Sequence, residues 1–305
     1  MNRPRPGVKA WAAVAALAVL AAGGAYAATR DDRPAQVAIN RMELLDTVFV
    51  LWRAGGARDD LARALERVPS EGEHRYFGIA PTPGTEVHTT PRYIEAADAV
   101  LGRDAWLTPP LRVRLRAAAE ADGRAAARED ESTRTAVLLS TAKILRAMGE
   151  SGAGFVSPAD GRAICAAASG ETDEVMDLGV ASELLELLGE AGCAWSPQVA
   201  RTVTSALDWL GEQEEVTLGE GLFGNAAARV LSGAGATPAT RAELDRLRQW
   251  ARDVLRDAAP ARLPERPHPL ILRLLVEVLP AGEPVVLSDR LKSDLVRALT
   301  YRIDD

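Results

Sequence analysis

Few residues of the kinds that usually carry chemistry occur in this chain, and they are scattered. The histidines are His74, His88 and His268, and the cysteines are Cys165 and Cys193. A zinc site needs several such ligands at short, regular spacing, as in HExxH or paired CxxC motifs, and neither motif is present. The sequence therefore predicts no metal site and gives no sign of a cofactor.

Motifs for the common catalytic mechanisms are missing as well. No GxSxG, P-loop or dinucleotide-binding glycine signature stands between a strand and a helix. Residues 219–224 spell GxGxxG, but no strand pattern precedes them, and we interpret the match as chance. Enzymatic activity stays open, and the sequence favours a non-catalytic role.

Two irregular stretches, 69–90 and 260–269, gather polar and aromatic side chains among several prolines and glycines. A long connection without regular structure is uncommon inside a compact domain and serves as a binding loop or a linker. We predict that both stretches lie on one rim of the fold and bind a ligand there, the alternative being plain connectors. The candidate binding residues are His74, Arg75, Tyr76, His88, Arg262, Arg266 and His268.

Acidic residues form runs in three further connections, 129–131, 171–174 and 212–220. Carboxylates from several loops could bind a hard cation or a basic peptide. As solvated loop tips they would instead stabilise the N-termini of the helices that follow, through the helix dipole. We favour the second interpretation.

The two cysteines invite a disulfide, because an even number of cysteines in an exported protein usually pairs. Cys165 lies inside a predicted helix, whereas Cys193 lies in a turn that we place level with the start of that helix. The two would then be roughly 12 Å apart along the helix axis, beyond the limit of about 7 Å for a bridge. We expect both thiols to be free.

The first 28 residues have the plan of an export signal. Basic residues precede an uncharged run over 10–28, and the end of this run, Ala25-Tyr26-Ala27, fits the small-x-small cleavage pattern. The run is also nearly long enough to remain as a membrane anchor, although its many alanines insert weakly. Either way, we predict an extracytoplasmic body that is secreted or anchored to the cell membrane, with residues 29–40 as a linker.

Composition narrows the class of partner. Hydrophobic residues make up 47% and charged residues 26%, as in ordinary globular proteins and unlike disordered chains. The formal net charge of −7 offers no general attraction to phosphate backbones, so we exclude nucleic acid as a partner. Contact with a membrane is expected only through residues 10–28.

A recurring helix start organises the rest of the chain. Five hydroxyl-proline pairs place a capping side chain before a proline at the first helical position. The pairs are Thr90-Pro91, Thr108-Pro109, Ser157-Pro158, Ser196-Pro197 and Thr237-Pro238. A glycine that would end the preceding helix stands upstream of most of them, for example Gly102 and Gly189. Trp106 and Trp195 occupy equivalent turn positions, and we expect both to plug the core.

Apolar spacing predicts twelve helices and no strand. The expected ranges are 41–53, 57–67, 92–101, 109–127, 133–148, 158–168, 175–188, 197–211, 221–232, 238–258, 269–279 and 289–303. The caps recur every 40 to 50 residues or so, which is typical of stacked helical hairpins. We predict about six hairpins in a repeat domain over 41–305.

The ends of this array decide its closure. If 57–67 pairs with 92–101, then 289–303 and 41–53 are left as partners for each other. An open solenoid needs polar end caps, and residues 41–53 are too apolar to face water. We therefore predict a closed α/α toroid, with an open α-solenoid as the alternative.

Short segments resemble a known group. Ser132-Thr133-Arg134-Thr135-Ala136 leading to Leu145-Arg146-Ala147-Met148-Gly149, and Leu178-Gly179-Val180 leading to Leu187-Leu188-Gly189, are similar to the second helix of hairpin repeats in α/α toroids of the prenyltransferase and squalene-cyclase type. The resemblance implies that fold over roughly 41–303. It implies no activity, because the DxDD motif, the Gln-Trp repeats and the zinc-binding Asp-x-Cys pair of that group are missing.

These observations predict a helical-repeat protein that binds a partner protein, a peptide or an envelope ligand through its long-loop rim. One alternative is an α/α-toroid enzyme that acts on an isoprenoid or a glycan in a central funnel, and another is a scaffold without a ligand. Carboxylates and aromatic rings that converge inside the ring would favour the enzyme. An apolar centre would favour binding or scaffolding.

Overall fold

The computed structural model describes residues 38–68, 86–126, 195–233, 237–259 and 262–303, with isolated helical positions between 141 and 169. This part of the chain is mostly α-helical with almost no strand, which confirms the predicted all-α class. The helices are α2 (Arg41–Arg53), α3 (Arg58–Glu66), α4 (Glu86–Val100), α5 (Arg103–Trp106), α6 (Pro109–Ala126), α10 (Pro197–Gly211), α11 (Leu218–Gly233), α12 (Pro238–Leu255), α13 (Pro269–Val278) and α14 (Asp289–Ala298). The predicted leader, residues 1–28, and the predicted helix at 175–188 lie outside the described residues.

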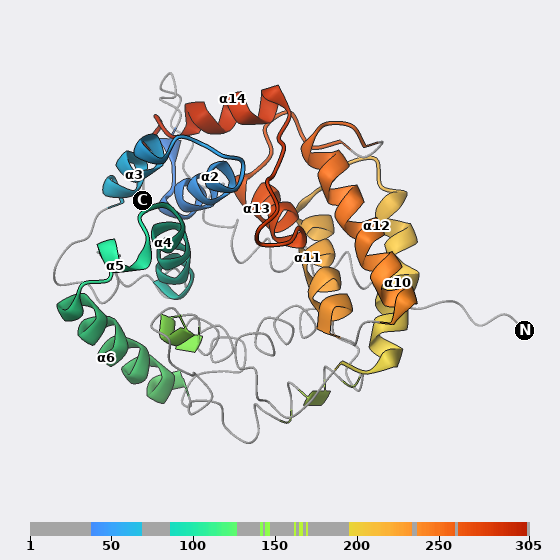
Figure 1. Cartoon of the computed structure of the whole chain (residues 1–305), viewed down its shortest axis with the longest axis horizontal. Helices are drawn as coiled ribbons and strands as arrows, with labels where there is room; N and C mark the ends of the chain where they lie inside the picture. Colours follow the sequence, from blue (N-terminus) through green and yellow to red (C-terminus); the bar gives the residue numbers. More distant parts are fainter. Residues whose placement is uncertain are drawn as a thin grey trace, which may run out of the picture.

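The described helices form two layers (Figure 1). Helices α4, α2, α13 and α11 lie on the inside of the arrangement, and each contacts the next in that order. Helices α6, α3, α14, α12 and α10 lie on the outside. The contacts of α3 with α4, α10 with α11, α12 with α13 and α14 with α2 are those expected for hairpins of one outer and one inner helix.

The two ends of the described chain meet. Helix α2 contacts α14, and a parallel pair of two-residue strands joins β1 (Ala38–Ile39) to β2 (Arg302–Ile303). The predicted pairing of 41–53 with 289–303 is therefore present. Residues 127–194 are described only at isolated positions, so the closed ring stays a prediction.

Local capping explains where four of the described helices begin. The hydroxyls of Ser196, Thr237 and Ser288 accept hydrogen bonds from backbone N–H groups three residues ahead, at 3.2, 3.2 and 3.3 Å. These bonds satisfy donors that a helix cannot satisfy itself. Helix α2 begins with a reciprocal capping box between Asn40 and Glu43. The predicted starts of these four helices are confirmed.

Two predicted boundaries are wrong. Helix α4 begins at Glu86, so Pro91 is its sixth residue and Thr90 is not its cap. The helix tolerates the loss of the one backbone hydrogen bond that Pro91, which has no N–H, cannot form. Helix α14 ends at Ala298 instead of continuing to 303. The residues after it form β2 because they pair with β1. The expectation of no strand was therefore wrong. The same pairing makes residues 38–40 part of the folded body.

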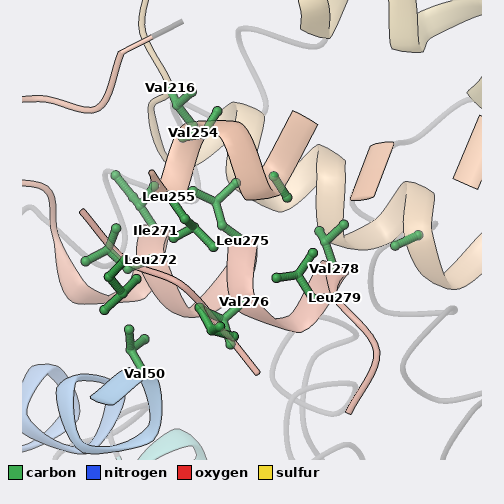
Figure 2. Packing of buried hydrophobic residues seen from close by; sticks show 14 of the residues in the cluster. Val50, Val216, Val254, Leu255, Ile271, Leu272, Leu275, Val276, Val278 and Leu279 are labelled. Atoms are coloured by element: carbon green, nitrogen blue, oxygen red, sulfur yellow. The ribbon is translucent and has the colours of Figure 1, made fainter. Parts of the chain in front are cut away.

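Helix α13 lies at the centre of the main core (Figure 2). Leu272 and Val276 of α13 lie on the side of Val50 of α2, whereas Ile271 and Leu275 lie towards Val254 and Leu255 of α12. Leu272, Leu275 and Val276 are at most 1% exposed. Burial of such side chains stabilises a fold by about 1.5–3 kcal/mol each, so this contact anchors the inner layer to the outer one.

The turn tryptophans are core residues, as predicted. Trp106 and Trp195 are 8% and 7% exposed. Trp106 packs edge-on against Tyr93, and its indole N–H donates to Asp98 Oδ1 at 2.7 Å.

Among the described residues, no helix combines the length and the apolar character needed to cross a membrane.

Close packing of Trp195 against Gly233 gives a test of the role of Trp195 as a core residue. A Cβ atom on Gly233 would lie 2.7 Å from Trp195 Cδ1, so we expect Gly233→Ala to lower the free energy of unfolding by about 1–3 kcal/mol. Gly211→Ala is the matched control, since Gly211 also ends a helix and a Cβ there would meet nothing within 4 Å. Urea unfolding followed by circular dichroism measures both. Equal free energies of unfolding for the two variants would contradict the close packing of Trp195 against Gly233.

Candidate functional site

A buried arginine on α13 joins three of the four inner helices. Arg273 is 5% exposed, and its guanidinium bonds three carboxylates. It donates to Asp46 Oδ1 of α2 at 3.0 Å, to Glu277 Oε1 one turn along α13 at 2.8 Å, and to Glu95 of α4. The Arg273 guanidinium carbon also lies 4.7 Å from the ring centre of Phe49, a cation–π contact.

The network continues to both sides of Arg273. Arg92 of α4 donates to the second oxygen of Asp46 at 2.6 Å. On the other side, Asn225 of α11 donates to Glu277 Oε2 at 3.1 Å and accepts from Arg229 at 3.0 Å. Polar side chains from α4, α2, α13 and α11 thus form one bonded cluster, which we call the inner network. Its six charged members, Asp46, Arg92, Glu95, Arg229, Arg273 and Glu277, comprise three acids and three arginines.

Burial sets the electrostatics of this network. Loss of solvent raises the pKa of Asp46, while Arg92 and Arg273 act to lower it. For Arg273, burial disfavours the charge, but Glu95, Glu277 and Asp46 outweigh it and leave the pKa well above its ordinary value. An arginine keeps its proton inside proteins, so Arg92 and Arg273 present two permanent positive charges to Asp46, and burial still leaves the pKa of this carboxyl above its ordinary value.

Several partly exposed side chains of the inner helices recur at helical spacing. Helix α2 contacts α3, α14, α4 and α13, and it carries the half-buried Phe49 and the exposed Trp52 one turn apart. Arg92 and Glu95 repeat at helical spacing on α4, as do Leu222 and Arg229 on α11. We call this surface the inner wall. Its members are Phe49, Trp52, Arg92, Glu95, Leu222, Arg229 and Glu277.

His268, a predicted binding residue, has two structural roles. It is the N-cap of α13, where its Nδ1 accepts from the N–H of Leu270 at 3.2 Å. Its Nε2 lies 2.9 Å from Glu43 Oε1 at the start of α2. Because Nδ1 accepts, the ring proton is on Nε2 and is donated to Glu43. His268 therefore connects the N-terminal turns of α2 and α13 at the predicted rim.

The other predicted rim residues are partly accounted for. The backbone of Arg262 exchanges two hydrogen bonds with the 212–217 connection, donating to Glu214 and accepting from Val216, each at 2.9 Å. Its side chain and that of Arg266 are exposed. His88 lies in the first turns of α4, but the structure does not describe its side chain. The predictions for His74, Arg75 and Tyr76 lie outside the described residues.

The expectation of free thiols is wrong for Cys165, which is disulfide-bonded in the structure. Cys193, the other cysteine of the sequence, lies outside the described residues. The expected separation placed Ser196 level with the start of the 158–168 helix. Ser196 Oγ instead donates to the carbonyl of Ser169 at 2.9 Å, so Ser196 lies beside residue 169 and not beside residue 158.

One acidic run is described, and it behaves as a helix start. Glu220 accepts from the backbone N–H of Thr217 at 2.8 Å and is nearly buried at the first turn of α11.

The GxGxxG residues, Gly219 to Gly224, lie inside α11 and form no phosphate loop. In the described part of the chain, no three His, Cys, Asp or Glu side chains gather as metal ligands do.

A second possible site is a hollow of about 330 Å³ between the outer helices α10 and α12. Leu207, Asp208, Arg246 and Trp250 are among its lining residues. Asp208 and Arg246 bond each other at 2.8 Å across it and are largely exposed. Its polar groups thus satisfy one another at the surface, and the inner wall is the better candidate.

The inner network was not predicted from the sequence, although a signal for it exists. Asp46 interrupts the apolar run 44–51, and Arg273 interrupts the apolar run 270–276. A single charge inside a buried helix needs a partner on a neighbouring element, so each of these residues marks a contact. The identity of the partners follows only once it is known which helices meet.

No protein-family model, curated protein or solved structure matches this chain. The function must therefore be argued from the inner wall itself.

Removal of the central carboxylate tests the inner network. Asp46→Asn keeps the shape of the side chain but leaves Arg92 and Arg273 without their shared buried anion, and we expect a loss of about 3 kcal/mol in unfolding free energy. Asp208→Asn, which removes the surface partner of Arg246, is the control and should cost at most about 1 kcal/mol. Urea unfolding measures both variants. A similar small cost for both would show that the network does not hold the inner helices.

The contact between Glu43 and His268 predicts a pH dependence. Burial favours the neutral acid, but hydrogen bonds from His268 and the backbone of Asn40 outweigh it and lower the pKa of Glu43 from 4.5. A lowered pKa in the folded state means that the carboxylate stabilises the fold above pH 4.5 and that this contribution is lost as the pH falls through the folded value. Glu43→Gln should therefore be less stable than wild type by about 0.5–1 kcal/mol at neutral pH, with the gap closing in acid.

Unfolding curves at several pH values measure the gap, with the exposed Glu66→Gln variant of α3 as the control. A gap for Glu43→Gln that persists unchanged in acid would rule out the carboxylate as its cause.

Proposed function

We propose that this chain is an extracytoplasmic helical-repeat protein that binds a ligand on its inner wall. The observation that carries the proposal is the gathering of partly exposed charged and aromatic side chains on one side of four helices. If the connecting loops had no role beyond joining helices, this gathering of side chains would not be needed. A scaffold without a ligand could fill the inside of the helices with apolar side chains instead. Binding sites combine a few fixed polar groups with apolar and aromatic surface, and the inner wall has this composition.

The inner network supports the proposal because it fixes the wall. Glu95 is bonded to the buried Arg273, and Arg92 is bonded to the buried Asp46. Side chains whose positions are set by buried partners lose little conformational freedom when a ligand arrives. The site proposed here therefore differs from the rim predicted from sequence, where His268 caps a helix and the side chains of Arg262 and Arg266 are exposed.

A closed α/α toroid is the architecture that we propose around this wall. Its support is the meeting of α2 with α14 and of β1 with β2, together with the hairpin pairing of the described helices. In a closed ring, the inner wall lines a central space that is reached from the ends of the ring. In an open solenoid, the same side chains line a concave surface.

An enzyme on the same fold is the alternative. Carboxylates do converge on the inner wall, as an enzyme would require. However, Glu95 and Glu277 each bind the guanidinium of Arg273, and a carboxylate held by an arginine is a poor proton donor. The charged wall also suits an isoprenoid chain badly. Binding without chemistry is the simpler function for these groups.

The proposed location outside the cytoplasm has two supports. The N-terminal sequence has the features of an export signal or anchor, and Cys165 is disulfide-bonded. Disulfides persist mainly in oxidising compartments.

Thermal unfolding with a ligand panel tests the proposal. The panel contains neutral oligosaccharides, short acidic and basic peptides, and geranylgeranyl diphosphate. A ligand at 100 times its Kd stabilises the folded state by about 2.7 kcal/mol, so at least one class should raise the Tm of the full chain. The double variant Arg92→Lys, Glu95→Gln should lose that rise.

The control is Asp208→Asn combined with Arg246→Lys, which alters an ion pair in the hollow between α10 and α12 and should keep the rise in Tm. A panel without any stabilising class, or a rise that the inner-wall variant keeps, would refute the proposed site. Turnover of a panel member would instead support the enzyme.

A further inference from the structure

We infer that the ligand of the inner wall is a neutral oligosaccharide that stacks on Trp52 and is hydrogen-bonded by Arg92 and Glu95. This inference rests on the proposed function and adds the chemical class of the ligand. It follows from three properties of the junction between α2 and α4: an exposed ring, unused donors and acceptors, and a balanced charge.

Trp52 supplies the ring. It is 38% exposed, and among the described residues no other aromatic side chain is as exposed. Phe49 lies beside it, with ring centres 6.1 Å apart and a tilt of 46°. Phe49 in turn packs under Arg273. The indole is therefore held by Phe49 on one side, and its exposed part can accept a flat apolar group.

Arg92 and Glu95 supply the polar groups. Only Nη1 of Arg92 is bonded, to Asp46, so its other N–H groups have no partner within the described residues. Glu95 bonds Arg273 through Oε2, which leaves Oε1 without a described partner. A fixed donor and a fixed acceptor thus stand three residues apart on α4. A hydroxyl group both donates and accepts, so neighbouring hydroxyls of one sugar match both.

Charge selects a neutral ligand. The three acids of the inner network are matched by three arginines, and the innermost members, Asp46 and Arg273, are buried. A charged ligand that paired with Arg92 or Glu95 would compete with these bonds and leave a buried charge unpaired, which is costly. A ligand with many hydroxyls and no net charge leaves every existing pair intact.

The separation of the groups calls for more than one ring. Trp52 lies six residues after Asp46, the residue that holds Arg92. At a rise of about 1.5 Å per residue, this is about 9 Å along α2. Ala99, one turn beyond Glu95 on α4, is a small residue on the same side. A chain of linked sugars can therefore stack on Trp52 and reach Arg92 and Glu95 with an adjoining unit.

Isothermal titration with the full chain tests the class. The probes are maltotriose, cellotriose and triacetylchitotriose, and the comparison ligands are trialanine, triglutamate and trilysine. We expect at least one trisaccharide to bind, and we expect Trp52→Ala to weaken it at least tenfold. Trp52→Phe, which keeps a ring, should retain most of the affinity, and Arg92→Lys should weaken it.

Val296→Ala is the matched control, because Val296 is also an exposed apolar side chain but lies on the outer helix α14, away from the inner wall. It should leave trisaccharide affinity within about twofold. Unchanged thermal unfolding of Trp52→Ala excludes misfolding as the cause of its loss, since an exposed side chain contributes little to stability.

The outcomes separate the two proposals. Peptide binding that depends on Trp52, without saccharide binding, would overturn the saccharide class and keep the inner wall as a site. Trisaccharide binding that Trp52→Ala does not weaken would overturn the site. If no probe of either kind binds, both the saccharide class and the proposed function fail.

Discussion

The contact of Arg273 with Asp46 is the constraint on which the inner layer depends. Arg273 sits in the middle of an apolar helix, so α13 can enter the core only if a neighbour brings a carboxylate to it. Asp46 of α2 and Glu95 of α4 do so, which fixes how α2, α4 and α13 are rotated about their axes. The same rotation decides which side chains remain exposed. The inner wall is therefore a consequence of this buried pair.

The network and the apolar core have different tasks. Replacement of a buried ion pair by apolar groups is often neutral or stabilising, so the free energy of folding comes mainly from contacts such as those of Leu272, Leu275 and Val276 around α13. Apolar contacts alone tolerate small rotations and shifts. A guanidinium with three carboxylate partners does not, because a displaced helix would leave a charge unpaired. The core thus provides stability, and the network determines alignment.

The sequence predicted what depends on neighbours in the chain. The start of α10 at Ser196-Pro197 and the capping role of Ser288 follow from a hydroxyl, a proline and the donors three residues ahead, and the structure confirms both. The end of α14 was missed because Arg302 pairs with Ala38, far away in the sequence. Asp46 and Arg273 were visible as charges in apolar runs, but their partners depend on which helices meet. Nothing in the sequence indicated that His268 caps α13 and contacts Glu43, because Glu43 lies near the opposite end of the chain.

The position of α2 links folding to binding. Asp46 and Arg273 are separated by 227 residues, and β1 and β2 join the two ends of the described chain. Contacts between such distant segments form slowly, since the entropy of closing a long loop must be met first. Helix α2 is itself largely apolar, and its buried Asp46 is bonded by Arg92 of α4 and Arg273 of α13. The inner wall therefore cannot form on a partial chain: Phe49 and Trp52 come from one end of the sequence, and the arginine that orients Phe49 comes from the other.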